Sequence, residues 1–323
     1  MDTTFSILGL TAHAYGLFAA FAALVMLAGV RYFGQKKLPN GTASLVVVLG
    51  VALGVVGARL LYCVCNVSTF METYENAWLM LRFFDGGLSW PGMAAGVMAA
   101  AAIAARVMKI RFADVMDAVC APAGLAMAAL RFGEQFTDLG VGKAVAEGFA
   151  TEKLPWLFSM SRMGVAVEYR LNVWAYEAVA GLVIFGLIAL LWRRLSKRSG
   201  DTALFFAALF GASQIIFESM RDDGHMLIIF LRIGQLGAAA LVIAAWVILQ
   251  KRASKGQKIA MWAELAVCVA AIVLLEFSLD GRLTIGHPSL FRDYTVMTAV
   301  CGILFAHPCA LLFGKEKPCA ERA

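Results

Sequence analysis

The residues of this 323-residue chain that could do chemistry are a few charged side chains inside long apolar runs. An ionisable group within a membrane span costs at least about 2.5 to 3.5 kcal/mol on insertion scales, so it usually faces a partner, a cavity or a substrate. These candidates for a site are Arg59, Asp114, Asp117, Arg131 with Glu134, Glu177, Glu218 with Arg221, and Arg232 with Gln235.

Spacing sorts these candidates, because side chains three or four residues apart share one helical face. Arg131 can pair with Glu134, and Glu218 can pair with Arg221, with Gln214 one turn further along the same face. Any single pair is equally well explained as an ion pair that holds helices together. Three arginines toward one membrane face favour a ligand, and because guanidinium groups match phosphate geometry, we expect a lipid headgroup.

The elements that must position these charges are transmembrane helices. Hydrophobic residues make up 61% of the chain and charged residues 15%, and about 20 apolar residues suffice to cross a hydrocarbon core. The sequence therefore predicts an all-α, polytopic membrane bundle without a cleavable signal. The nine expected spans are 12–30, 43–64, 88–107, 113–130, 173–192, 203–220, 226–249, 259–279 and 295–313.

Charge in the connections predicts the orientation. Basic connections alternate with acidic or mixed ones, so the positive-inside rule places the N-terminus outside and the C-terminus inside. Because the inner connections are merely short and basic, we expect any chemistry to face outward. The basic set is 31–37, 106–111, 193–198, 251–258 and the C-terminal tail, and the outer set is 65–87, 131–172, 221–225 and 280–294.

Composition argues against several other classes of protein. The seven cysteines lie mostly in apolar segments, where a thiol behaves as a small hydrophobe, so we expect no disulfide framework, metal site or cofactor. The net charge of +6 is explained by basic connections, so no nucleic-acid partner is expected. A small-solute transporter ranks lower, because the charges gather toward one face and no internal repeat is visible.

Two glycine pairs predict close helix packing. Gly50 with Gly54, and Gly92 with Gly96, are spaced as the small residues that let neighbouring membrane helices approach.

Several short motifs, taken in order, resemble the prolipoprotein diacylglyceryl transferase family between about residues 12 and 250. They are AYGLFAA (14–20), GARLLYCVCN (57–66), FDGGLSWPG (84–92), DAVCAPAGLAMAALRFGEQ (117–135), AYEAVAG (175–181), IIFESMR (215–221) and IGQ (233–235). The family moves a diacylglyceryl group from phosphatidylglycerol to a lipobox cysteine of a prolipoprotein. The resemblance implies the same activity for this chain, with phosphatidylglycerol and a prolipoprotein as partners, and a location in the bacterial cytoplasmic (inner) membrane. Oligomeric state is not predicted.

The resemblance also divides the chain and suggests a binding site. It implies a seven-helix domain over residues 1–250, with an outer charge-rich segment at 131–172, followed by an extension at 251–323 that holds two further spans. Substrate-binding roles are implied for Arg131, Glu218, Arg221, Tyr15, Asp85, Gly86, Gly87 and Glu177.

Several positions depart from the family pattern. Pro91 stands where the resemblance leads us to expect an essential histidine, Gln214 where a second arginine is expected, and Glu134 where an asparagine is expected. A carboxylate in low-dielectric surroundings can act as a general base, which makes Glu134 a candidate catalytic residue. The alternative is that Glu134 only neutralises Arg131. His225, in an outer connection, is a weaker candidate base.

The missing arginine has a candidate replacement. Gln214 and Arg232 each lie six residues below the expected outer end of a span, which places both about 9 Å deep at a rise of about 1.5 Å per residue. We therefore expect Arg232 to supply the cation and to be catalytic. The competing hypothesis for the whole chain is a non-catalytic, lipid-binding membrane partner protein.

Overall fold

The computed structural model describes residues 4–7, 10–67, 70–71, 82, 87–137, 139–147, 151, 153–163, 166–222, 227–228, 231–283 and 290–314. Within these residues, nine helices are long and apolar enough to cross a membrane. The prediction of a multi-pass helical membrane protein is confirmed. The helices are α1 (Ala14–Gly34), α2 (Thr42–Cys65), α4 (Trp90–Val107), α5 (Phe112–Glu134), α7 (Val173–Leu195), α8 (Asp201–Met220), α9 (Ile233–Leu249), α10 (Lys255–Leu279) and α11 (Leu290–Phe313).

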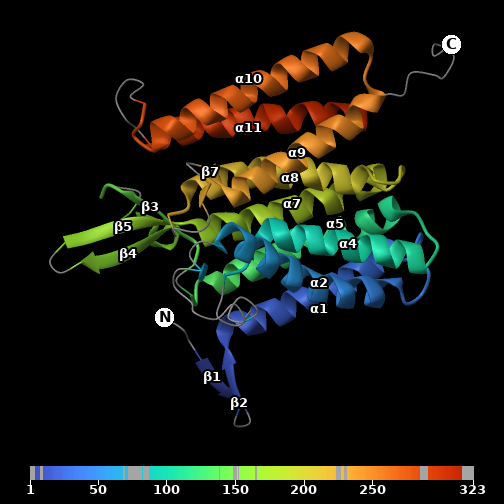
Figure 1. Ribbon diagram of the computed structural model, residues 1–323, viewed down its shortest axis with the longest axis horizontal. Helices are drawn as coiled ribbons and strands as arrows, with labels where there is room; N and C mark the ends of the chain where they lie inside the picture. The colour runs from blue at the N-terminus through green and yellow to red at the C-terminus, as the bar shows by residue number, and fades with distance from the viewer. Residues whose placement is uncertain are drawn as a thin grey trace.

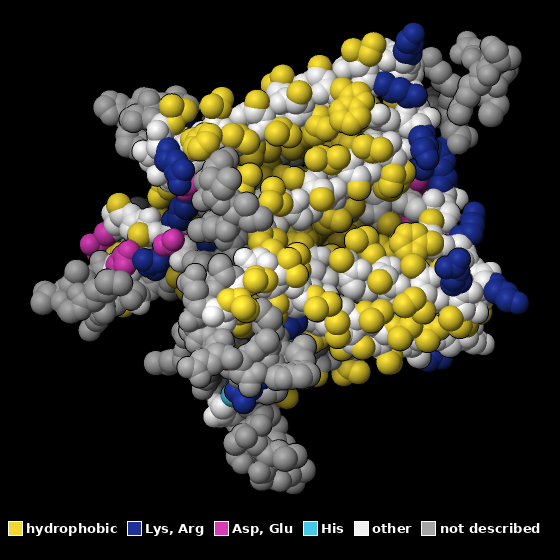
Figure 2. All heavy atoms as spheres, in the orientation of Figure 1, with side chains coloured by type: hydrophobic (Ala, Val, Ile, Leu, Met, Phe, Trp, Pro, Cys, Tyr) yellow, Lys and Arg dark blue, Asp and Glu magenta, His cyan; other side chains and the backbone are white. Residues whose placement is uncertain are grey.

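The helices lie side by side along the long dimension of the molecule (Figure 1). The main packing partners are α2 with α4, α1 with α5, α5 with α7, and α8 with α9, while α10 and α11 pack together and α11 contacts α8 and α9. Hydrophobic side chains cover most of the face seen in Figure 2. Such a surface suits a bundle whose solvent is lipid.

A small antiparallel sheet lies at one end of the bundle, called here the sheet end (Figure 1). Its strand order is β3-β5-β4, formed by β3 (Val141–Val145), β4 (Phe158–Met163) and β5 (Ala166–Asn172), with the short 3-10 helix η3 (Pro155–Leu157) before β4. The strands belong to the segment predicted to be charge-rich. A second hairpin, β1 (Thr4–Ile7) with β2 (Leu10–His13), precedes α1.

The helix α9 begins at Ile233, so the predicted start of the seventh span at residue 226 is wrong. The residues before it form a short antiparallel hairpin, β6 (Leu227–Ile228) with β7 (Leu231–Arg232), in which Leu227 pairs with Arg232. Their backbone groups bond across the hairpin and are therefore not part of the helix.

Glycines allow α2 and α4 to touch through their backbones. A Cβ on Gly92 would lie 2.3 Å from the carbonyl oxygen of Gly57, and one on Gly96 would lie 2.1 Å from that of Leu53. Gly54 faces Met93 at an ordinary contact distance, whereas a Cβ on Gly50 would meet nothing within 4 Å. The packing prediction is confirmed for Gly92 and Gly96 and wrong for Gly50.

This difference predicts unequal effects of the same substitution. Gly96→Ala should destabilise the protein by about 1 to 3 kcal/mol, because the added methyl group forces the two helices apart. Gly50→Ala should be neutral or slightly stabilising, since alanine favours the helix and open space receives its methyl group. Thermal unfolding in detergent, followed by circular dichroism, measures both. Equal effects of the two variants would contradict the packing described.

Candidate functional site

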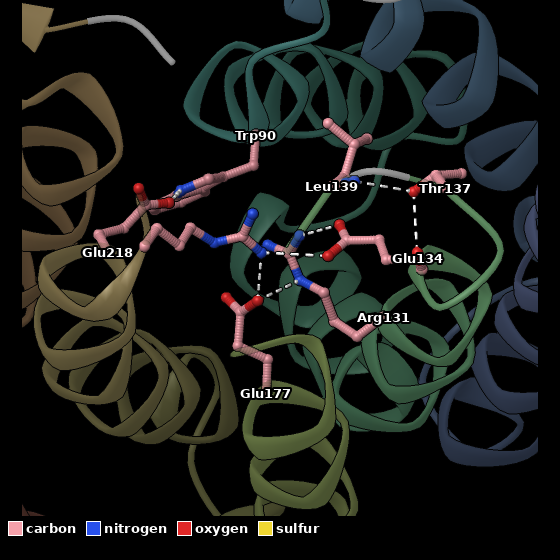
Figure 3. Close-up of polar contacts among 8 residues, drawn as sticks. Trp90, Arg131, Glu134, Thr137, Leu139, Glu177 and Glu218 are labelled. Atoms are coloured by element: carbon pink, nitrogen blue, oxygen red, sulfur yellow. Dashed lines mark hydrogen bonds and ion pairs between the residues drawn. The ribbon is translucent and has the colours of Figure 1, made fainter. Parts of the chain in front are cut away.

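Four charged side chains form a ring of ion pairs at the sheet end, called here the quartet: Arg131, Glu134, Glu177 and Arg221. Arg131 and Glu134 lie in the last turn of α5, Glu177 near the start of α7, and Arg221 directly after α8. Arg131 pairs with Glu134 through Nη1 and with Glu177 through Nε at 3.2 Å. Arg221 Nη2 pairs with Glu177 and lies 3.2 Å from Glu134 Oε2. Figure 3 shows Arg131, Glu134 and Glu177 pointing toward one another.

The quartet is largely buried, with the Arg131 side chain 14% exposed, and its formal charges cancel. Glu177 is fully buried, Glu134 is 5% exposed and Arg221 is 8% exposed. Removing four charges from water is costly, and only close pairing with good geometry offsets that cost. Each carboxylate contacts both guanidinium groups, so every charge in the quartet has two opposite neighbours. The structure therefore explains how charges predicted inside apolar runs are tolerated.

The loop after α5 and the strand β3 hold the quartet in place. Thr137 Oγ1 donates to the Glu134 carbonyl oxygen at 2.8 Å and accepts from the Leu139 amide at 3.2 Å. Gly140 has φ +74°, and a Cβ there would lie 2.8 Å from Glu134 Oε2, so a glycine lets the loop close over this carboxylate. Gly142 forms a β-bridge with Arg221, which fixes the backbone that carries the second guanidinium group.

Glu218 lies beside the quartet and is bound by a tryptophan. Trp90 Nε1 donates to Glu218 Oε1 at 2.8 Å, and Glu218 is 6% exposed (Figure 3). A Cβ on Gly234 would lie 2.2 Å from the carboxyl carbon of Glu218, so this carboxylate rests on the first turn of α9. The positive end of a helix dipole favours an anion at that place. Sequence reasoning missed Trp90, although an indole N–H beside a predicted site was a usable signal.

The remaining predicted binding residues are partly described. Tyr15 lies in the first turn of α1, and a Cβ on Gly133 would lie 3.3 Å from its ring, so Tyr15 packs beside the last turn of α5. The Gly87 carbonyl oxygen accepts from Arg59 Nη1 at 3.3 Å. Asp85, Gly86 and the alternative base His225 lie outside the described residues.

Arg232 and Gln214 are not at the same depth, so that part of the prediction is wrong. Gln214 lies inside α8, whereas Arg232 is the N-cap residue of α9, because the β6–β7 hairpin displaces the start of that helix. Arg232 is nevertheless close to the site, since Gly234, two residues on, contacts Glu218. The side chain of Gln214 is fully buried, and neither its oxygen nor its nitrogen has a hydrogen-bond partner in the described part of the chain.

The quartet predicts a large penalty for removing one member. Glu177→Leu should destabilise the protein by about 3 to 5 kcal/mol, because it leaves two buried guanidinium groups with too little negative charge. Arg170→Ala removes ion pairs with Glu168 and Asp222, whose side chains are 30% and 53% exposed, and should cost at most about 1 kcal/mol. Thermal and denaturant unfolding in micelles would compare them. A Glu177→Leu protein as stable as Arg170→Ala would contradict the buried network.

Comparisons with known proteins support a family assignment for this fold. The sequence profile described as prolipoprotein diacylglyceryl transferase matches residues 2–251. The phosphatidylglycerol–prolipoprotein diacylglyceryl transferase of Paenarthrobacter aurescens is 28% identical over 248 residues, which cover 70% of this chain and 76% of the relative. The enzyme of the same name from Geobacillus kaustophilus is 27% identical over 264 residues, which cover 79% and 94%. The chain therefore belongs to the prolipoprotein diacylglyceryl transferase family of membrane transferases.

Proposed function

We propose that this chain transfers the diacylglyceryl group of phosphatidylglycerol to the lipobox cysteine of a prolipoprotein at the outer face of the bacterial cytoplasmic membrane. The observation that carries the proposal is the quartet, in which two arginines from separate segments, one buried and one nearly so, meet beside a third acidic residue, Glu218. Family membership supplies the reaction class, and the paired guanidinium groups supply the chemistry that recognises a lipid phosphate.

Orientation follows from charge. Lys and Arg side chains gather at the end of the bundle away from the sheet (Figure 2), and the positive-inside rule assigns such an end to the cytoplasm. The sheet end, with the quartet, is then outside, as are the residues before α1. The family profile ends at residue 251, which supports a division into a seven-helix catalytic domain (1–250) and an extension (251–323).

Arg131 and Arg221 form the proposed phosphate clamp. In the structure Glu134 and Glu177 contact Nη1 and Nε of Arg131 and Nη2 of Arg221. A phosphodiester offers the same paired oxygens as a carboxylate, so it can replace one carboxylate while the other keeps the guanidinium groups aligned. Glu177 is the deeper of the two and stays, and Glu134 is displaced. Gln214, Glu218, Tyr15 and the Asp85–Gly87 turn are proposed to contact the rest of the headgroup.

The displaced Glu134 is the proposed general base. Its carboxylate takes the proton of the acceptor thiol, the resulting thiolate sulfur attacks the glycerol carbon that bears the phosphate, and the C–O bond to phosphate breaks. The electron pair of that bond leaves with glycerol phosphate. Arg131 and Arg221 bind the additional negative charge on this phosphate until it is released. Arg232 is proposed as a further cation for this leaving group, reached from the N-cap of α9.

The first test is an assay with labelled phosphatidylglycerol in nanodiscs and a lipobox peptide, with mass analysis of the cysteine. The wild-type protein should add a diacylglyceryl group, and Arg131→Ala should abolish the addition because the clamp loses one guanidinium group. Arg232→Ala should also lower it strongly. Arg194→Ala, at an exposed position in the last turn of α7, is the control and should keep full activity. A fully active Arg131→Ala protein would exclude the proposed clamp.

A second test separates the base from a charge-balancing residue. Glu134→Gln should lower kcat by about 10² to 10⁴, the usual contribution of general base catalysis, while the KM for phosphatidylglycerol stays the same or falls, because the amide no longer competes for the guanidinium groups. If Glu134 only neutralises Arg131, kcat should be nearly unchanged. Asn at this position should behave as Gln does in either case.

The closed quartet also favours one other function. Both oxygens of Glu134 contact arginines in the structure. If the Glu134 carboxylate stays on the arginines when lipid binds, it cannot act as a base, and the protein would bind lipid without turnover as a lipid-binding partner protein. Retention of labelled phosphatidylglycerol with no peptide product, in the same assay, would select this alternative.

A further inference from the structure

The helices α10 and α11 follow the region matched by the family profile, which ends at residue 251. At one edge of the bundle, α11 packs against α8 and α9, and α10 packs on α11 (Figure 1). At the sheet end, polar side chains of this pair contact the segments that carry the proposed site.

The first contact comes from a buried carboxylate on α10. Glu276 is 4% exposed, and its Oε1 accepts from Gln235 Nε2 at 2.7 Å. The side-chain oxygen of the same residue, Gln235 Oε1, accepts a hydrogen bond from the backbone N–H of Arg232 at 3.1 Å. Glu276 therefore orients the side chain that closes the first turn of α9, and Glu218 rests on that turn at Gly234. A buried carboxylate is a costly way to fill space, which argues for a role beyond packing.

A second contact comes from α11. Tyr294 is 8% exposed, and its hydroxyl group donates a hydrogen bond to the Ser219 carbonyl oxygen at 3.0 Å. Ser219 lies between Glu218 and Arg221 in the chain, at the end of α8 where carbonyl groups lose their helical partners. This hydrogen bond fixes the backbone from which both acidic and basic site residues project.

A third contact reaches the sheet. Asp280, the C-cap residue of α10, lies 3.7 Å from Lys143 Nζ on β3. The same strand forms the β-bridge to Arg221 at Gly142 and accepts the Asp222 amide at Val141, 3.0 Å away. The pair α10–α11 thus touches the start of α9, the end of α8 and the strand that holds the second arginine of the quartet.

We propose that α10 and α11 form a built-in brace for the site, in which Glu276 and Tyr294 are positioning residues. Glu276 fixes the position of the Arg232 backbone through Gln235. Tyr294 fixes the backbone between Glu218 and Arg221 through the Ser219 carbonyl. The effect on catalysis rests on the proposed transferase function, whereas the effect on the α9 and α8 termini does not.

The test compares two carboxylates of the same helix. Glu276→Leu removes the contact at the sheet end, and Glu264→Leu removes a contact with His307 Nδ1, 2.6 Å long, further from that end. Glu276→Gln is the rescue variant, because its amide oxygen still accepts from Gln235. Full-length proteins in phosphatidylglycerol nanodiscs are assayed for kcat and KM, and for hydrogen exchange of the backbone amides of residues 233–236.

Glu276→Leu should lower kcat/KM at least tenfold, the effect of losing a hydrogen bond to a charged group, and should speed exchange of the α9 first turn. Glu276→Gln should restore most of both readouts, and Glu264→Leu should change neither. If Glu276→Leu and Glu264→Leu behave alike in both readouts, the brace is wrong. If the wild-type protein transfers no lipid, the proposed function fails, and the exchange rates alone decide the brace.

Tyr294→Phe covers the case in which Glu276→Leu does not fold, since it removes a single hydroxyl group. It should speed exchange of the Glu218–Asp222 amides and lower kcat/KM, while unfolding stays cooperative. Unchanged exchange in that segment would overturn the role of Tyr294.

Discussion

The balance between two largely buried guanidinium groups and two buried carboxylates is the constraint on which the rest of the site depends. An arginine side chain cannot lose its charge inside a protein, so the fold must bring acids to Arg131 and Arg221. The α5 helix supplies one acid in its own last turn, through the three-residue spacing of Arg131 and Glu134. Helix α7 supplies the other, Glu177, from its buried face. Arg221 reaches them because the chain leaves helical geometry there, with ψ at 142°.

In the proposed reaction, charge balance also links lipid binding to proton transfer. A phosphodiester that enters the quartet adds one negative charge, and in a buried site an unbalanced charge is expensive. If the displaced Glu134 carboxylate takes a proton from the acceptor thiol, the sum of charges on the four residues and the phosphate returns to zero, and the new charge lies on the sulfur that must react. The same residue that keeps the resting site neutral is therefore suited to activate the nucleophile when the donor is bound.

The sequence predicted the membrane bundle well because length and hydropathy are local properties, and all nine expected spans coincide with helices. It also picked out each member of the quartet, since charges in apolar runs are conspicuous. It did not show that Glu177 pairs with both arginines, because that contact joins residues from α5, α7 and the end of α8. Arg232 was misplaced because apolar residues 226–231 read equally well as helix or strand. Glu276 was missed because a single carboxylate in a late span has no neighbour in sequence that suggests its partner.

The start of α4 shows why a base should be sought in the quartet. Pro91 occupies the first turn of that helix, where its missing N–H has no helical partner to lose. A Cβ on Gly237 would lie 2.5 Å from the Pro91 ring, so this position is filled by contact with α9. The adjacent Trp90 turns its indole to Glu218 and packs edge-on against Phe210, with ring centroids 5.3 Å apart. The segment that the resemblance expects to present a histidine therefore packs helices and holds an acid instead, and Pro91 offers no titratable group. In the proposed reaction, proton transfer then falls to a carboxylate that donor binding displaces from the arginines, and among the quartet members Glu134 lies nearer the loop, beneath Gly140.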